Sequence, residues 1–339
     1  MKLLQRQKFP APDFSPLDWA GDPLSVGSLR QKVVLVDFFS LGDPVGVRDF
    51  SPLADLGERY ADAGLVVVGV HVPAYDFERD PTAVRRALWE AGVHWPVALD
   101  QSFETFRAWR AGDLPARALL DGTGCFRGWQ RDPAEIAELE PAVRWLLREN
   151  QADVALPEAG PGLRAPQWYP TPEQRFGTRG VSWEQEAGGD EAPAEAAGED
   201  ARRKFDSLPD LRAEGRPYLL GEWSRSEDRL TLESDEGSLA IVYEARGVYV
   251  VAARHEDGAE DNELRLRVDG EAPGASTAGR DVELDEAEDV ARVRIDRGGV
   301  YHLVQNESFG LHHLEIEIRG RGTELFGLEF ATENVPAVD

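Results

Sequence analysis

A single cysteine, Cys125, is present among 339 residues. One thiol cannot form an intramolecular disulfide or a dithiol redox pair, and it cannot build a cysteine-based metal cluster. The six histidines show no metal-ligand spacing, and the neighbours His312 and His313 would point to opposite faces of a strand. We therefore expect neither a metal site nor a bound cofactor.

Positive charge and long apolar runs are also scarce. Lys and Arg number 37 against 63 Asp and Glu, which gives a formal net charge of −26. Nucleic acid and anionic membrane surfaces would be repelled, so neither is expected as a partner. The sequence has no run of 18 apolar residues and no signal-like apolar stretch near its start. These absences predict a cytoplasmic protein without membrane insertion.

Residues 1–150 alternate the patterns of strands and helices. Apolar runs at 33–38, 65–71 and 95–99 predict buried strands of a largely parallel sheet. Helix starts are predicted at the Asp-Pro pairs 43–44, 80–81 and 132–133, because aspartate caps a helix and proline suits its first position. The first of these helices should run to about residue 60, and a hairpin is expected over 116–129. The pattern predicts an α/β domain.

The rest of the chain changes character twice. Residues 151–205 are proline-rich and then acidic, with Glu, Ala and Gly dominating 184–200, so we expect a linker with a disordered segment. From 206 to 335, apolar residues alternate with polar ones in eight short runs separated by Gly and Asp turns. That pattern predicts an antiparallel β-sandwich, of the jelly-roll kind.

Both domains resemble parts of known redoxins. The first is similar to the TlpA-like redoxins, and more closely to the thioredoxin-like module of DipZ-type cytochrome c biogenesis proteins, through residues 11–14, 33–38, 64–71, 77–80, 95–100 and 114–116. The second resembles the carbohydrate-binding-module-like sandwich at the C-terminus of that family, through residues 171–177, 220–223, 265–270 and 301–304. The resemblance implies a thioredoxin fold followed by the β-sandwich.

The redox motif that this resemblance implies is missing. Redoxins place Cys-x-x-Cys directly after the first strand and its aromatic residue, where this sequence reads Asp43-Pro44-Val45-Gly46. Asp43 takes the place of the nucleophilic cysteine and Gly46 that of the resolving one, and neither a carboxylate nor a hydrogen atom can exchange electrons with a disulfide. Asp43 is either a helix cap or an anion that contacts a ligand.

Other positions of the redoxin site are retained. Asp37 matches the buried acid beneath the active site, where burial would raise its pKa. Leu114-Pro115 matches the cis-proline loop, which in redoxins lies against bound polypeptide. The resemblance thus implies a polypeptide-binding groove, unless the turn serves folding alone. Its predicted lining is Phe39, Asp43, Pro44, Leu114 and Pro115.

Three further features have a structural or a functional interpretation. Cys125 is expected to be a buried, inert side chain. Trp168, Trp183 and Trp223 could together offer a stacking platform for a sugar, although Trp223 fits a core position better. The acidic loop 256–261 could hold calcium, but a solvated turn is favoured because the ligand spacing is irregular.

These observations predict a redox-inactive, thioredoxin-like protein that acts as a binding or adaptor module. Its partner would be a polypeptide at the former redox groove or a glycan at the sandwich. The alternative is a relative of the thiol-disulfide oxidoreductases with residual activity, using Cys125 as its only thiol. A third possibility is a structural module that recruits a partner through a joint surface.

Overall fold

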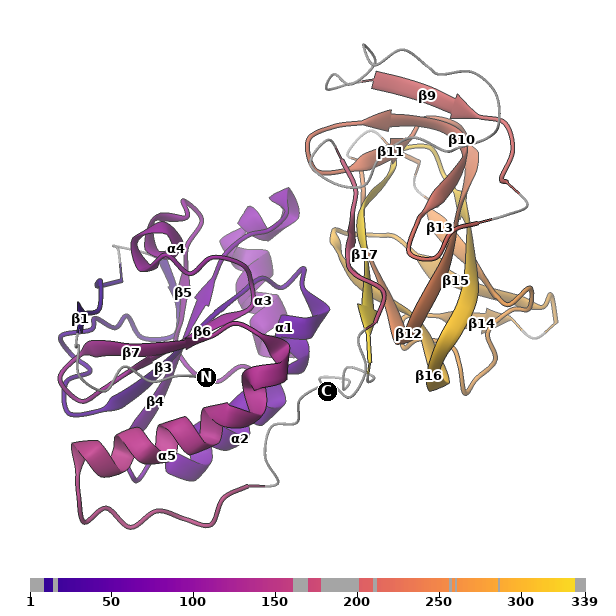
Figure 1. Cartoon of the computed structure of the whole chain (residues 1–339). Coiled ribbons are helices and arrows are strands. Elements are labelled where there is room, and N and C mark those ends of the chain that lie inside the picture. The colour runs from indigo at the N-terminus through magenta and orange to yellow at the C-terminus, as the bar shows by residue number, and fades with distance from the viewer. Residues whose placement is uncertain are drawn as a thin grey trace. The chain divides into compact units, whose positions relative to one another are not determined.

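The computed structural model describes residues 9–14, 18–160, 170–177, 201–209, 212–255, 258–259, 261–285 and 287–332. The chain divides into two compact units at Pro166 and Gln167 (Figure 1). Residues just after the predicted boundary at 150 still belong to the first unit, because Val154 and Leu156 pack against its core. Among the described residues, no helix is long and apolar enough to cross a membrane.

The first unit is built on one seven-stranded sheet. Its strands, in spatial order, are β1 (Phe9–Pro10), β7 (Cys125–Gln130), β6 (Ala116–Leu120), β3 (Val33–Phe39), β4 (Leu65–His71), β5 (Val97–Leu99) and β2 (Asp18–Ala20). The pairs β3–β4 and β4–β5 are parallel, whereas β6 and β7 form an antiparallel hairpin beside β3. This arrangement confirms the thioredoxin fold.

Helices cover both faces of this sheet. They are α1 (Pro44–Arg48), α2 (Phe50–Tyr60), η1 (Asp76–Arg79), α3 (Pro81–Glu90), α4 (Glu104–Trp109), η2 (Pro133–Glu138) and α5 (Leu139–Asn150). Leucines of α2 and α5 pack with Val33 and Leu35 on one face, and Trp109 of α4 packs with Val34 and Val36 on the other. Alternate residues of β3 therefore enter separate cores, as expected for a central strand buried on both faces.

Two predicted helices are interrupted in the structure. The helix expected from residue 43 to about 60 breaks at Asp49, whose amide bonds to Gly46 three residues back and whose carboxylate accepts from Arg117. The helix expected from 133 begins as the 3-10 turn η2 and becomes α-helical only at Leu139. The start at Asp80 is confirmed, because Thr82 N donates to Asp80 Oδ1 at 2.9 Å.

The second unit is an antiparallel β domain. Its strands are β8 (Gln174–Arg175), β9 (Ala201–Phe205), β10 (Tyr218–Arg225), β11 (Leu230–Leu232), β12 (Glu236–Arg254), β13 (Glu263–Val268), β14 (Glu283–Asp285), β15 (Val290–Arg294), β16 (Gly299–Arg319) and β17 (Thr323–Ala331). Because β12 pairs with both β10 and β17, and β11 links those two, the sheet closes on itself in a barrel-like way. The jelly-roll topology stays a prediction.

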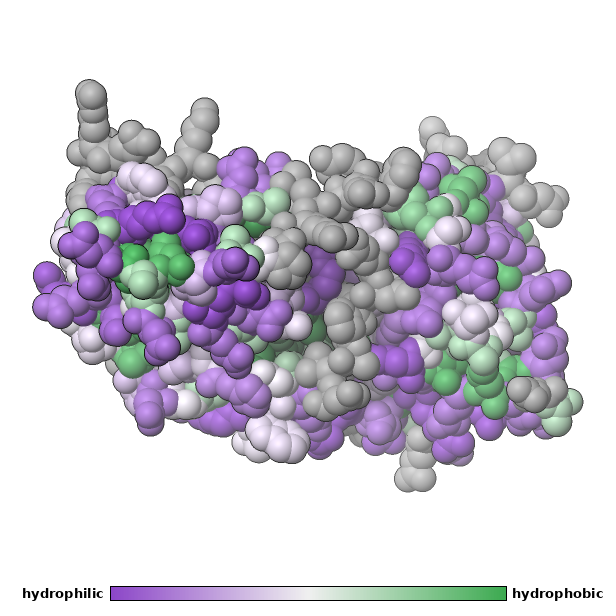
Figure 2. Space-filling view, turned by 90° about the horizontal axis from the view of Figure 1, so that it is seen from below, coloured by the Kyte–Doolittle hydropathy of each residue, from purple (hydrophilic) through white to green (hydrophobic). Residues whose placement is uncertain are grey.

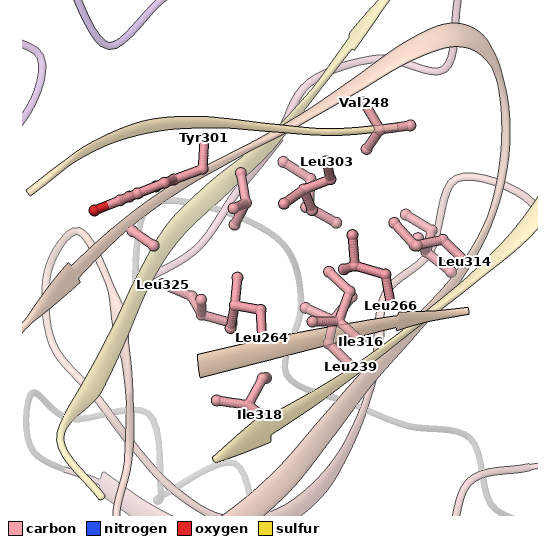
Figure 3. Close-up of a cluster of buried hydrophobic side chains, with 14 of the residues drawn as sticks. Leu239, Val248, Leu264, Leu266, Tyr301, Leu303, Leu314, Ile316, Ile318 and Leu325 are labelled. Carbon is pink, nitrogen blue, oxygen red and sulfur yellow. The ribbon is translucent and has the colours of Figure 1, made fainter. Parts of the chain in front are cut away.

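Long bent strands replace several of the short strands expected here. The runs at 238–245 and 247–253 are one strand, β12, which passes a bulge between Ala245 and Gly247. The strand β16 pairs alongside both halves of β12. Their inward side chains build a continuous apolar core (Figure 3). Trp223 belongs to that core with no exposed surface, which confirms its predicted place.

Part of the predicted linker also contributes to the second sheet. The short strands β8 and β9 lie within residues 151–205, and they pair with β17 and β10 respectively. Trp168, Trp183 and the acidic segment 184–200 lie outside the described residues. On the face of the molecule in Figure 2, hydrophilic residues predominate between small apolar patches, in keeping with the acidic composition.

Candidate functional site

The structure brings the degenerate redox positions and the proline loop together. Asp43 follows β3 at the start of α1, and Leu114-Pro115, directly before β6, is a cis peptide as predicted. A Cβ placed on Gly46 would lie 3.4 Å from Asp43 Oδ2 and 3.7 Å from Pro115 Cβ. A side chain at position 46 would therefore contact both the carboxylate and the proline.

Not every predicted groove residue reaches the surface there. Phe39 has no exposed surface, and its ring packs edge-on against Phe50, with the ring centroids 4.8 Å apart. It supports the site from below and cannot line a groove, which corrects that prediction. Asp43, Leu114 and Pro115 are half-buried, whereas the side chain of Pro44 lies outside the described atoms.

The loop between β3 and α1 is fixed by a buried carboxylate that the sequence did not single out. Glu78 of η1 accepts hydrogen bonds from Ser40 Oγ at 2.8 Å and from the Leu41 amide at 3.0 Å. His71 Nε2 lies 3.0 Å from the same carboxylate. Gly42 passes so close that a Cβ there would lie 2.5 Å from the Tyr75 ring. Glycine is therefore required by packing at position 42.

A second buried network lies under the site. Arg117 of β6 stands opposite Asp37 of β3 in the sheet, and its Nε lies 3.0 Å from Asp37 Oδ1. Its Nη2 donates to Asp49 Oδ2 at 2.8 Å, and its Nη1 donates to Gln130 Oε1 at 2.9 Å. All three charged side chains are almost fully buried. The guanidinium therefore connects the central strand to the junction of α1 and α2.

Burial dominates the titration of Asp37. It raises the pKa of this carboxyl to about 6, although the charge of Arg117 opposes the shift. The contact between Arg117 Nε and Asp37 Oδ1, at 3.0 Å, only partly offsets the loss of solvation that the ionised carboxyl suffers. The resemblance to redoxins implies an acid that exchanges protons with a cysteine, but positions 43 and 46 hold aspartate and glycine here.

The single thiol lies away from this site. Cys125 begins β7, beside the turn that joins β6 to β7, and Pro115 precedes the opposite end of β6. The five residues of β6 lie between the two positions, which puts them roughly 17–20 Å apart. Cys125 is half-buried rather than fully buried as expected. Within the described ranges, no three His, Cys, Asp or Glu side chains come together as metal ligands.

The fold and this arrangement define a thioredoxin-like protein whose two redox positions hold aspartate and glycine. Residues 180–330 match the family model described as "Thioredoxin like C-terminal domain". Protein DipZ of Mycobacterium bovis is 31% identical over 233 residues, which cover 68% of this chain and 32% of DipZ. The resemblance to DipZ-type redoxins is thereby confirmed, and the chain is a DipZ homologue that spans about a third of the DipZ length.

Other relatives match a smaller share of this chain. Thiol-disulfide oxidoreductase YkuV of Bacillus subtilis is 24% identical over 123 residues, or 36% of this chain and 82% of YkuV. Among solved structures, a thiol-disulfide isomerase from Corynebacterium glutamicum is 25% identical, covers 40% of this chain and 96% of its own, and has a TM-score of 0.37. YkuV carries the name of a thiol-disulfide oxidoreductase, whereas this chain has one cysteine.

Proposed function

We propose that the first unit binds polypeptides at the former redox site without exchanging electrons with them. The observation that carries this proposal is the position of Gly46, where a side chain would come within van der Waals distance of both Asp43 and the cis-proline Pro115. The surface elements of a redoxin groove stay together while both sulfur positions are lost. Buried hydrogen bonds to Glu78 and ion contacts of Arg117 hold the two loops that present this surface.

The enzyme alternative has less support from the same geometry. A residual oxidoreductase would need Cys125 at the groove, yet β6 separates this thiol from Pro115. Its activity would also need a second thiol from another molecule to complete a disulfide. A binding role needs neither.

Blocking the groove should weaken binding of a cysteine-free, unfolded peptide. We expect Gly46→Leu to reduce the affinity about tenfold, because its side chain would extend between Asp43 and Pro115. Fluorescence anisotropy of a labelled peptide with apolar and lysine residues measures this change. Lysine suits the net charge of −26, and a peptide with glutamate in place of lysine should bind more weakly.

Gly27→Leu is the matched control. Gly27 is exposed in the same unit, and a Cβ there would meet only Ser25 Oγ, at 3.7 Å. This variant should bind as the unmodified chain does. Equal affinity of the Gly46→Leu and Gly27→Leu variants, or no binding by the unmodified chain, would contradict the proposed function.

A further inference from the structure

The second unit contains a polar pocket of about 520 Å³. It lies within the size range of small-molecule sites. The floor comes from β9, β10, β11 and β17, which are neighbours in the sheet (Figure 1). Its principal polar groups belong to Arg202, Ser224, Thr231, Glu233, Arg321 and Glu324.

Strand register explains why the floor is polar. Arg202 stands opposite Ser224, Ser224 opposite Thr231, and Thr231 opposite Glu324. Residues paired in this way share one face of a sheet. The neighbouring residues Trp223 and Leu232 point the other way, into the apolar core. The row of four polar side chains therefore covers the outward face of four adjacent strands.

The charge of the pocket is opposite to that of the chain. Four arginines and two glutamates are among the described residues that line it, in a protein with a net charge of −26. Arg202 Nη2 and Arg321 Nη2 both lie 3.4 Å from Glu233 Oε2, and both arginine side chains are more than half exposed. Charge-assisted hydrogen bonds are usually 2.7–2.9 Å long. Two guanidinium groups thus share one distant carboxylate oxygen at the rim.

The serine and the two glutamates of the pocket are suited to bind hydroxyl groups of a ligand rather than a second negative charge. Ser224 Oγ donates to Glu233 Oε1 at 2.7 Å, which fixes that carboxylate from below. Glu324 lies 3.0 Å from Arg229 Nε and is mostly buried, and burial raises the pKa of its carboxyl. Carboxylates accept hydrogen bonds from hydroxyls, but they repel a phosphate dianion. Of the four arginines, Arg229 is engaged by Asp228 and Glu324, and Arg225 donates to the Gly177 carbonyl. The pocket therefore combines acceptors for hydroxyls with the rim pair of arginines for one negative charge.

We propose that this pocket binds a sugar that carries one carboxylate, as a uronic acid does. The rim arginines Arg202 and Arg321 bind the carboxylate, since guanidinium pairs with it through two parallel hydrogen bonds. Thr231, Glu233 and Glu324 bind ring hydroxyls. Recognition uses charge and hydrogen bonds, because Trp223 is buried and the described lining holds no Trp, Tyr or Phe. This site lies in the second unit and does not depend on the groove of the first.

Calorimetric titration of the full chain with methyl β-D-glucuronide tests the proposal. We expect saturable binding that is about tenfold tighter than binding of methyl β-D-glucoside, which has the same ring without the carboxylate. The double variant Arg202→Gln, Arg321→Gln should lose most of this preference. A matched control, Arg86→Gln with Arg294→Gln, removes the same charge at exposed positions outside the pocket and should keep it.

Each other outcome overturns the proposal. Equal affinity for the glucoside would show that the carboxylate is not recognised. Inorganic phosphate or acetate that competes as well as the glucuronide would indicate a general anion site. Absence of binding to the glucuronide would also contradict the assignment, and circular dichroism of each variant verifies that it is folded. None of these results bears on peptide binding by the first unit.

Discussion

Replacing Arg117 by glutamine is expected to lower the free energy of unfolding of the first unit by about 3–5 kcal/mol near neutral pH. The guanidinium is the cation that lies against both Asp37 and Asp49, and all three side chains are buried. Glutamine keeps one amide donor but no charge. Two carboxylates would then remain in the interior without a compensating cation, which is the costly case for a buried ion group.

The loss of stability in the Arg117→Gln variant should increase as the pH rises. Asp37 has a folded pKa of about 6 against an ordinary value of 3.8, so its protonated form favours the folded state. That contribution is complete below 3.8 and is lost as the pH rises through 6. Without Arg117 the pKa of Asp37 should rise further. The deficit of the Arg117→Gln variant should therefore be smaller at about pH 5 than at about pH 7.5.

Urea denaturation followed by tryptophan fluorescence measures this effect at both pH values. The relevant transition is the one that the substitution moves, because the chain has two compact units. Arg86→Gln is the control, since Arg86 is exposed and pairs with Glu90 across a helix surface; it should cost at most about 1 kcal/mol. A deficit for Arg117→Gln that is independent of pH, or as small as the control, would contradict the proposed network.

Restoring the two sulfur atoms should restore a redox-active disulfide. A Cβ added at position 46 would lie 3.4 Å from Asp43 Oδ2, so the double variant Asp43→Cys, Gly46→Cys places two thiol side chains within reach of each other. Cysteines in this relation can reach the Cβ separation of about 3.5–4.5 Å that a disulfide needs. The oxidised variant should show one free thiol, from Cys125, and the reduced variant three.

Thiol titration under denaturing conditions, with and without prior reduction, gives this count. Either single variant, Asp43→Cys or Gly46→Cys, should show two thiols per monomer and serves as the control. If the double variant keeps three thiols after oxidation, then positions 43 and 46 are farther apart in solution than the structure has them.

Much of the fold follows from local sequence patterns. Continuous apolar runs identify β3 and β4 as buried parallel strands, and Asp80-Pro81 marks the start of α3. The break at Asp49 was not predictable in this way, because it accompanies a hydrogen bond to Arg117, 68 residues further along the chain. In the second unit, Gly247 looks like a turn, yet the neighbouring strand β16 continues past it and keeps β12 in one piece.

For the site as well, features with a local sequence pattern were predictable, and contacts between distant parts of the chain were not. Positions 43, 46 and 115 were found because the redoxin motif has fixed spacing, whereas Phe39 was placed in the groove although its ring points into the core. The sequence analysis does not single out Arg117. A signal was present, because Arg117 is a charged residue within the apolar run 116–120, and this run pairs with the apolar run that contains Asp37. The pocket depends on pairing between four strands, which sequence alone does not specify.

Reduction of insulin by dithiothreitol is the most direct test of the central claim that this chain binds without redox turnover. The unmodified protein and Cys125→Ser should both leave the rate at the level of dithiothreitol alone, while the Asp43→Cys, Gly46→Cys variant should exceed it. Turnover by the unmodified chain that disappears in Cys125→Ser would contradict the account and restore the oxidoreductase interpretation.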